Sequence, residues 1–400
     1  MPAMHAAEIV VTTLTSLLTL GWSYQAVTAF RGIPTLADLT NPNSPLPIPT
    51  GYGPDVTVIV PACNEEASIQ ATLRSLLAST GVRLQIIAVN DRSTDRTGKR
   101  MDEIAAEAKT TPHHLEIIHN QELPLGWLGK THALSLGSNR ATAPWLLFTD
   151  GDVKFHPRAI ALSLGYAQAS HADHIVVGLT LEFKRIAEAA VFAAFQALAC
   201  WNVRLWKVAD PKSRDFFGAG GFNFVRRAVF DQIGGFSDLQ MEVVEDLRLG
   251  WKIKRDGFAQ RFVLGPGLVR IHWIQGAFGI VNLMEKNGFA GVRYRVGVSV
   301  FACLAFSLHI ALPLAAITMG GWPAAAGLAF YVAVALTYAA NRPISQVSPW
   351  VALLFAPATG LVSFAIARST FLALLRNGVV WRGTLYPLDE LRRNTGRSWR

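Results

Sequence analysis

The amino-acid sequence predicts an α/β protein with a doubly wound, mostly parallel sheet, and with transmembrane helices on its N-terminal and C-terminal sides. Three observations predict this class. Short apolar runs alternate with helical patterns between residues 56 and 270, and long uncharged stretches lie before and after that range. Hydrophobic residues make up 51% of the 400 positions and charged residues only 16%, against roughly 25% charged in a soluble domain. The composition therefore argues against a wholly soluble protein.

The first uncharged stretch runs from Ile9 to Phe30 and has the length of a membrane-spanning helix. Its 22 residues suffice to cross a hydrocarbon core of about 30 Å. A secretory signal is the alternative, but the residues before the stretch hold no Lys or Arg and end in Glu8, while Arg31 follows it. We expect residues 1–31 to be an anchor, with the chain from residue 31 onward in the cytosol.

Residues 32–55 are rich in proline and cannot hold a regular helix. The prolines are Pro34, Pro42, Pro45, Pro47, Pro49 and Pro54. This segment is predicted to be a linker.

The range 56–295 is predicted to be a cytosolic domain built around the sheet. Its strands are expected at 56–60, 84–90, 115–119 and 145–149, and its first helices after Asn64, Ser93, Gly129 and His156. The strands are almost continuously apolar, as parallel strands buried on both faces should be. Strands and helices in this order indicate a doubly wound sheet, in which ligands bind at the carboxyl ends of the strands.

A C-terminal transmembrane region is predicted at 296–376. No charged residue occurs from Val296 to Asn341, and the break at 320–323 divides this stretch into a hairpin of two helices. A further apolar run, 343–367, precedes a basic tail at 377–400. A third complete span would export that tail against the positive-inside rule, so we expect a re-entrant or surface-lying segment bent at Pro357 to Gly360.

Charge and cysteine content narrow the class further. The net charge is +9, but the basic residues are scattered or lie beside apolar runs. An anionic lipid surface is therefore the simpler partner, and no nucleic acid is expected beyond a nucleotide. The three cysteines, Cys63, Cys200 and Cys303, have no CxxC spacing, which excludes a disulfide framework and a zinc ribbon and fits a reducing compartment.

Polar residues gather where each of the first four strands ends. The clusters are Asn64-Glu65-Glu66, Asp91-Arg92-Ser93-Thr94-Asp95, Gly126-Trp127-Leu128-Gly129-Lys130 and Asp150-Gly151-Asp152. Helix capping is the alternative for Asn64 and Ser93, because short polar side chains bind free amides at helix starts. Capping does not explain Asp150-Gly151-Asp152. Two carboxylates one residue apart suit a divalent cation that also holds phosphate oxygens.

Six segments between residues 56 and 270 together resemble the family 2 glycosyltransferases, which have the GT-A fold. In chain order they are VIVPACNEE, NDRSTD, LGKTHALSLG, TDGDV, FGAGGFNFVRRAVFDQIGGF and VVEDLRLGWKIKRDGF. TDGDV resembles the DxD motif of the family, and VVEDLRLG its ED motif. A DxD sequence alone is weak evidence, but six segments in the family's order are specific.

The resemblance implies a site for a nucleotide-sugar donor, expected to be UDP-linked. Its residues would be Pro61, Asn64, Glu65, Asp91, Lys130, Asp150 and Asp152. Asp91 would bind the uracil or ribose, Asp150 the ribose or a metal-bound water, and Asp152 an Mn²⁺ or Mg²⁺ ion on the diphosphate. Asp152 and Asp150 are thus the expected metal residues. Lys130 would add a second positive charge near the diphosphate, unless it lies on a solvated helix face.

The same resemblance implies that Asp246 is the general base of an inverting transfer, with Glu245 as the rival. A base is needed because the acceptor hydroxyl must lose its proton as it attacks the anomeric carbon. The alternative is that the pair only marks a helix start, where the helix dipole favours acidic residues.

Gly220, Gly221, His272 and Trp273 are the expected acceptor-binding residues. Many membrane-bound family members carry a QxxRW motif, but Val269-Arg270-Ile271-His272-Trp273 has valine for glutamine and histidine for arginine. A processive polysaccharide synthase is therefore less expected. An interfacial Trp beside a structural His explains the last two residues equally well.

A closer resemblance connects the chain with the bacterial prenoid-lipid glycosyltransferases of the carotenoid- and hopanoid-associated branch, and more distantly with ceramide glucosyltransferases. The segments 126–133, 284–287 and 378–386 carry it, and they imply a lipid acceptor. The apolar stretches 186–208 and 274–286 could lie at the membrane surface or against the membrane helices and admit such a lipid. A buried core helix is the alternative for 186–208.

The sequence therefore predicts a multi-pass enzyme of the inner membrane, with a cytoplasmic catalytic domain, that moves a hexose from a nucleotide sugar to a lipid. A polyprenyl-phosphate glycosyltransferase is the alternative within enzymes, and an inactive lipid- or nucleotide-binding scaffold is the alternative outside them. Asp246 argues against a scaffold, which needs no base. A transporter is disfavoured because the membrane segments lack buried ionisable pairs, apart from His309 and Arg368.

Overall fold

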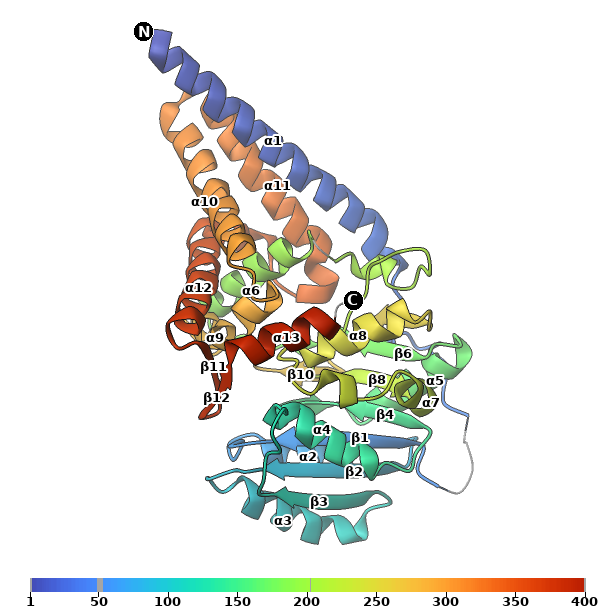
Figure 1. Ribbon diagram of the computed structural model, residues 1–400. Coiled ribbons are helices and arrows are strands. Elements are labelled where there is room, and N and C mark those ends of the chain that lie inside the picture. The colour runs from blue at the N-terminus through green and yellow to red at the C-terminus, as the bar shows by residue number, and fades with distance from the viewer. Residues whose placement is uncertain (1, 49–52, 202, 399–400) are drawn as a thin grey trace. The chain divides into compact units, whose positions relative to one another are not determined.

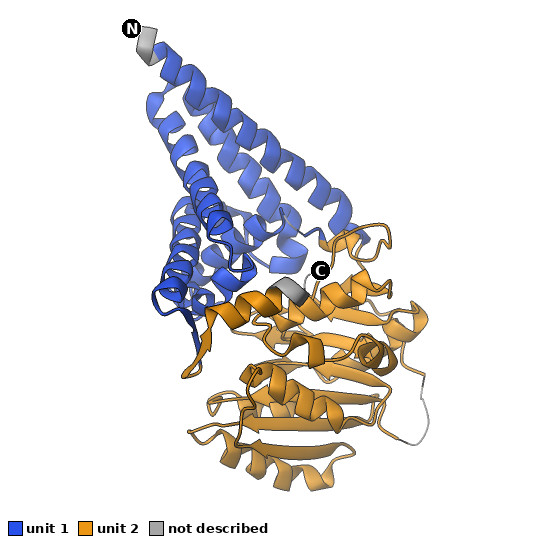
Figure 2. Cartoon of the chain, in the orientation of Figure 1, with its two compact units in different colours: residues 1–35, 183–204, 273–381 blue, residues 36–182, 205–272, 382–400 orange. Residues whose placement is uncertain are grey.

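The computed structural model describes residues 2–48, 53–201 and 203–398, and these group into two units (Figure 2). Unit 1 combines residues up to 35 with 183–204 and 273–381, and unit 2 combines 36–182, 205–272 and 382–400. Each unit is thus assembled from three separate stretches of chain. Residues 49–52 of the predicted linker and 399–400 of the predicted tail lie outside the described residues.

Unit 2 is built on a seven-stranded sheet whose strand order is β3-β2-β1-β4-β8-β6-β9 (Figure 1). The strands are β1 (Val56–Ala62), β2 (Leu84–Asp91), β3 (His114–Asn120), β4 (Trp145–Phe148), β6 (His174–Val177), β8 (Asn223–Arg226) and β9 (Gln260–Val263). Only β8 runs antiparallel to its neighbours. The predicted fold class, a mostly parallel sheet with apolar helices on its N-terminal and C-terminal sides, is confirmed.

Helices follow the strands at the predicted places. They are α2 (Ile69–Leu77), α3 (Thr97–Glu107), α4 (Gly129–Asn139) and α5 (Ala159–Ala169), and later in unit 2 α7 (Arg227–Gln232), α8 (Glu245–Arg255) and α13 (Leu388–Ser398). Every residue of β1, β2 and β4 is buried. Both faces of this part of the sheet are therefore covered, which explains why its strands are apolar without alternation.

The strand order changes direction at the boundary between β1 and β4. β2 and β3 lie on one side of β1 and β4 lies on the other, with Ile59 in register with Phe148. The carboxyl ends of β1 and β4 therefore lie next to each other, and a crevice at such a switch point is where open α/β sheets bind ligands.

A second, three-stranded sheet has the order β5-β10-β7 and consists of β5 (Lys154–Phe155), β10 (Val269–Ile271) and β7 (Thr180–Leu181). The proline-rich residues 36–48 contain no regular helix, and they pack on unit 2 through backbone hydrogen bonds. The Leu39 amide donates to the Leu264 carbonyl at 2.9 Å, and the Leu264 amide donates to the Ala37 carbonyl at 2.7 Å.

Unit 1 consists mainly of helices. They are α1 (Pro2–Gly32), α6 (Ile186–Ala199), α9 (Gly279–Gly291), α10 (Val296–Met319), α11 (Gly321–Ser345) and α12 (Phe355–Leu375), followed by the strand β11 (Gly378–Trp381). Trp22 of α1 is fully buried in the core of this unit. Its ring makes edge contacts with Phe355 at 5.3 Å and Phe330 at 6.2 Å between ring centroids, and these join α1 to α11 and α12.

Four helical stretches of unit 1 are long and apolar enough to cross a membrane: 5–35, 296–319, 321–345 and 349–375. The break between the second and third falls at Gly320, as predicted. The bend predicted at Pro357 to Gly360 is wrong, because α12 continues through both residues. Pro357 lies in the first helical turn, where its missing amide hydrogen leaves no helix bond unmade.

The two shorter apolar stretches belong to the core of unit 1. α6 ends at Ala199 and not at Val208, and its buried residues, among them Ala194 and Leu198, share one apolar cluster with Ile280 and Met284 of α9. α6 therefore packs against the long apolar helices, which is one of the two placements expected for it.

We expect the protein to remain in the membrane fraction after washing with high salt and with alkaline carbonate. The outward faces of the long helices expose large apolar side chains, such as Phe301 and Leu304, and salt does not weaken their burial in lipid as it weakens surface charge pairs. Immunoblotting of pellet and supernatant measures this. Release by salt alone would show that the helices do not span a bilayer.

Candidate active site

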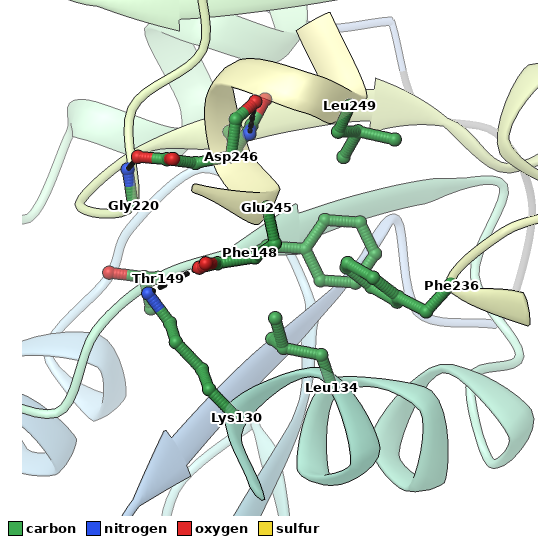
Figure 3. A pocket seen from close by; sticks show the side chains of 10 residues that line it. Lys130, Leu134, Phe148, Thr149, Gly220, Phe236, Glu245, Asp246 and Leu249 are labelled. Atoms are coloured by element: carbon green, nitrogen blue, oxygen red, sulfur yellow. Dashed lines mark hydrogen bonds and ion pairs between the residues drawn. The ribbon is translucent and has the colours of Figure 1, made fainter. Parts of the chain in front are cut away.

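Lys130 connects three parts of unit 2 at the carboxyl ends of the strands. Its Nζ atom lies 2.6 Å from Asp150 Oδ1 and 2.6 Å from Glu245 Oε1, and Figure 3 shows the side chain directed at Glu245. Lys130 comes from the first turn of α4, Asp150 follows β4, and Glu245 begins α8. One ammonium group thus joins two of the predicted site residues, which lie far apart in the sequence.

Asp246 is held by backbone amides on both of its oxygens. The Gly220 amide donates to Oδ2 at 2.7 Å (Figure 3), and the Leu247 amide donates to Oδ1 at 2.8 Å. Both Glu245 and Asp246 lie in the first turn of α8, where the helix dipole favours carboxylates. The pair therefore does mark a helix start, as the alternative holds. A helix start alone does not explain why the Gly220 amide donates to Asp246.

Glycines let the chain approach these carboxylates closely. A Cβ atom on Gly220 would lie 2.6 Å from Asp150 Oδ2, and one on Gly218 would lie 1.9 Å from the Asp246 carbonyl oxygen. A side chain at 218 would collide with backbone, and one at 220 would displace the Asp150 carboxylate from its place beside Lys130. The residue type at 218 and 220 is therefore fixed by the packing of this loop against the site.

Buried polar side chains from neighbouring strands hydrogen-bond to backbone carbonyls of α8. The Asn223 side-chain amide donates to the Asp246 carbonyl at 3.3 Å, and Asn223 Oδ1 pairs with His174 Nε2. Gln260 Nε2 lies 2.8 Å from His174 Nδ1 and donates to the Gly250 carbonyl at 3.0 Å. Burial lowers the pKa of His174 to about 4, so the imidazole is neutral at pH 7. Sequence reasoning missed these residues, because single buried polar residues on separate elements form no pattern.

The carboxylates of the site outnumber the positive charges near them. Burial, and then the charge of Glu245, raise the pKa of Asp246 to about 6 against the opposing effect of Lys130. Burial, followed by Asp150 and Glu65, raises the pKa of Asp152 to about 7. Burial alone would lower the pKa of Lys130, but the carboxylates raise it well above its usual value, so Lys130 stays charged.

Asp150 and Asp152 fit a divalent cation that is shared with a substrate. Among the described residues no group of three or more His, Cys, Asp or Glu side chains is arranged to hold a metal. Mg²⁺ and similar ions are often bound by one or two carboxylates together with substrate phosphates, so a complete protein cage is not required.

Pro61 and Glu65 lie beside the turn that carries these two aspartates. A Cβ atom on Gly151 would be 3.5 Å from the Pro61 carbonyl oxygen and 3.5 Å from Glu65 Cγ. The neighbouring carboxyl ends of β1 and β4 therefore bring Glu65 to the expected metal residues.

Asp91 ends β2 and is 3% exposed. The Arg92 guanidinium donates to both of its oxygens, at 3.0 and 2.9 Å, and Asn120 Nδ2 donates to Oδ1 at 2.8 Å. Arg92 and Asn120 were not identified as site residues from the sequence. The sequence signal that could have identified Arg92 is its position next to Asp91 in the NDRSTD segment.

Asn64 joins the loops that follow β1 and β2. Its Oδ1 accepts from the Thr94 amide at 2.8 Å, and its own amide donates to Ser93 Oγ at 3.0 Å. The N-cap residues of α2 and α3 are Ser68 and Arg96. Asn64 and Ser93 therefore hold two loops together and do not cap these helices.

The four expected acceptor residues fall in different places. Gly220 and the next residue, Gly221, lie beside Asp246, to which the Gly220 amide donates. His272 directly follows β10 of the small sheet in unit 2. Trp273 belongs to unit 1, where its ring packs on Phe195 at 5.6 Å between centroids. Their roles toward an acceptor stay predictions.

The C-terminal part of unit 2 adds two residues that sequence reasoning did not place in the site. Arg382 Nη2 donates to Glu65 Oε1, and the Gly129 amide donates to Tyr386 Oη at 3.3 Å. The signal in the sequence was the resemblance of segment 378–386 to lipid glycosyltransferases, which pointed to a family but not to a role.

Residues 57–234 match the family model described as "Glycosyl transferase family 2". The chain therefore carries a glycosyl transferase family 2 domain, as the resemblance of its motifs predicts. Glu245 and Asp246 lie beyond the matched residues, so their assignment depends on the geometry above.

Among curated proteins, the chain is 27% identical over 223 residues to "Probable glycosyltransferase YdaM" of Bacillus subtilis (strain 168), covering 52% of this chain and 49% of that protein. It is 31% identical over 97 residues to "Glycosyltransferase GlyA" of Streptococcus pneumoniae serotype 4, covering 24% of this chain and 13% of that protein. The chain thus spans about half the length of the first of these relatives and much less of the second.

Among solved structures, the chain resembles the mannosyltransferase PcManGT from Pyrobaculum calidifontis, solved in complex with GDP-Man and Mn²⁺. The TM-score is 0.52 at 19% identity, over 91% of this chain and 99% of that one. At this identity the likeness shows the fold, a GT-A-like one.

We expect glycosyl transfer to lose activity as the pH falls through about 6. A base must be ionised to accept a proton, and an ordinary Asp ionises near pH 4, whereas the pKa of Asp246 is raised to about 6. Below pH 6, kcat/KM should fall about tenfold per pH unit. Rates between pH 4.5 and 8, with saturating divalent cation to keep Asp152 ionised, measure this; an acid limb near pH 4 would contradict the assignment.

Proposed function

We propose that this protein is a membrane-anchored, inverting, metal-dependent glycosyltransferase that moves a hexose from a nucleotide sugar to a lipid. The observation that carries the proposal is the placement of Asp246 beside the Lys130 cluster at the switch point of the sheet, within a chain that has a glycosyl transferase family 2 domain. A binding protein needs a donor site, but it does not need a buried carboxylate with a raised pKa next to it.

The donor is proposed to bind along the carboxyl ends of β2, β1 and β4. Asp91 would contact the nucleoside, and Asp150 and Asp152 would hold the cation, which supplies positive charge to the diphosphate that leaves. The GDP-Man and Mn²⁺ bound to PcManGT are in line with this donor class. A UDP-linked sugar is the expectation from the sequence, so uridine and guanosine donors both need testing.

Asp246 and Lys130 are proposed to have different roles in the transfer. Asp246 would accept the proton of the acceptor hydroxyl, since its raised pKa of about 6 makes it a stronger base than an ordinary Asp while it remains ionised at pH 7. Lys130, which stays charged, would stabilise the negative charge that develops on the leaving diphosphate. Attack by the acceptor in a single displacement inverts the anomeric configuration.

The lipid acceptor is supported by the composition of the chain. Four helical stretches in unit 1 are long and apolar enough to cross a membrane, and an acceptor dissolved in the bilayer suits an enzyme anchored there. The resemblance to the prenoid-lipid branch points the same way. We infer that the protein lies in the inner membrane and faces the cytoplasm with unit 2, where nucleotide sugars are made.

The function is tested by lipid analysis together with an inactive variant. Mass spectrometry of lipids from cells with and without the gene should show a lipid heavier by one hexose only when the gene is present. Asp152→Ala should remove this product and weaken divalent-dependent nucleotide binding while the protein still folds, because Asp152 serves a ligand and not the apolar core. Nucleotide binding that is unchanged with metal present would contradict the metal role.

Asp246→Asn should keep sugar-nucleotide binding and lose transfer. The amide preserves the size of the side chain but cannot accept a proton, so we expect a loss of about 10²- to 10⁴-fold in kcat. Ionising Asp246 costs stability as the pH rises from about 4, where an ordinary Asp ionises, to about 6, so over this range the melting temperature of the parent should fall relative to that of the variant.

Glu245→Gln is the matched control for this variant. It removes the neighbouring carboxylate, and we expect a smaller loss of kcat. Near-normal transfer by Asp246→Asn together with an inactive Glu245→Gln would show that Glu245, and not Asp246, is the general base.

A further inference from the structure

Arg382 lies in the cluster of carboxylates although it comes from the C-terminal end of the chain. Its guanidinium contacts Glu65, and the charge of Glu65 in turn acts on Asp152. The Cys63 thiol begins the loop after β1 that contains Glu65, and the charges of Arg382, Asp91, Arg92 and Glu65 all act on it. Arg382 therefore lies beside the proposed donor residues, next to Glu65 and on the side of Asp152.

The segment that carries Arg382 is a built part of unit 2. Tyr386 is 5% exposed, its hydroxyl accepts from the Gly129 amide, and it also hydrogen-bonds Arg92, the partner of Asp91. Leu388 and Leu391, at the start of α13, are buried. Arg382 is thus held close to the site by anchored neighbours, and it is not a residue of a loose basic tail.

The backbone conformation at Arg382 is one that does not favour an arginine. Arg382 has φ +48° and the following Gly383 has φ +79°, the pattern of a tight turn with two left-handed residues. Asn-Gly is the favoured pair for such a turn, and a residue with a long side chain is unfavourable in the left-handed conformation. Asn64 and Arg92, at the neighbouring strand ends, also have positive φ, and such strain collects at functional sites.

We propose that Arg382 is a donor-binding residue that contacts the sugar-linked phosphate of the nucleotide sugar, exchanging Glu65 for phosphate oxygens when the donor binds. This proposal rests on the proposed function and adds a residue to its donor site. An arginine fork binds phosphate through two parallel hydrogen bonds, which a carboxylate partner holds ready in the free protein. Lys130 lies between Asp150 and Glu245, so Arg382 would supply the second protein cation that a diphosphate requires.

The test uses Arg382→Asn in the full-length protein in lipid nanodiscs. This variant removes the guanidinium and creates the favoured Asn-Gly turn, so its melting temperature should be unchanged or higher. UDP and GDP are titrated with Mn²⁺, and UMP and GMP are titrated in parallel. For whichever diphosphate the parent protein binds, we expect an affinity loss of about 10- to 100-fold, and a clearly smaller loss for the matching monophosphate.

Two further variants sharpen the result. Arg382→Lys keeps the charge without the fork and should lose less affinity than Arg382→Asn. Arg392→Ala removes the same charge from an exposed position on α13 and should bind as the parent does.

The outcomes separate this inference from the function on which it rests. Unchanged diphosphate affinity in Arg382→Asn, or equal losses for diphosphate and monophosphate, would overturn the role of Arg382 while leaving the proposed function intact. A parent protein that binds neither UDP nor GDP would instead overturn the proposed function, and the role of Arg382 with it.

Discussion

The contact of Lys130 with Asp150 and Glu245 is the interaction on which the rest of the site depends. Several carboxylates meet at the ends of β1 and β4 and at the start of α8, in surroundings that include the apolar side chains of Leu134 and Phe148. Like charges in such surroundings repel and favour protonation. Removing one partner of a buried ion pair leaves an uncompensated charge, which is strongly destabilising. Lys130 therefore holds these parts of the chain together.

The surroundings of Asp246 hold its carboxylate in place and leave it charged at pH 7. Asp246 receives two backbone amides, and the neutral His174 with Asn223 and Gln260 fixes the backbone below it. Backbone amides lower the pKa of a carboxylate that accepts from them, but burial and the charge of Glu245 outweigh this effect, so the pKa of Asp246 stays raised at about 6. Lys130 contacts the neighbouring Glu245, and it lowers the pKa of Asp246 less than burial raises it.

Unit 1 obeys a different constraint. Its core is held by aromatic edge contacts around Trp22, while the outer faces of its long helices expose apolar side chains such as Phe301. In water such surfaces would associate, but in lipid they need no covering protein. The division of the chain into a unit with a polar site and a unit with apolar surfaces suits the proposed transfer from a water-soluble donor to a lipid.

The sequence by itself determined the elements that depend on local pattern. Apolar runs predicted the strands β1 to β4 within one or two residues, uncharged stretches predicted the long helices, and the order of six motifs predicted the family 2 domain. The structure alone decided what depends on contacts between distant residues: the support of Asp246 by His174, the place of Arg382 beside Glu65, and the continuous α12 where a bend was expected. Hydropathy records which residues avoid water, but a hydrogen bond between single residues on separate elements leaves no periodic trace in one sequence.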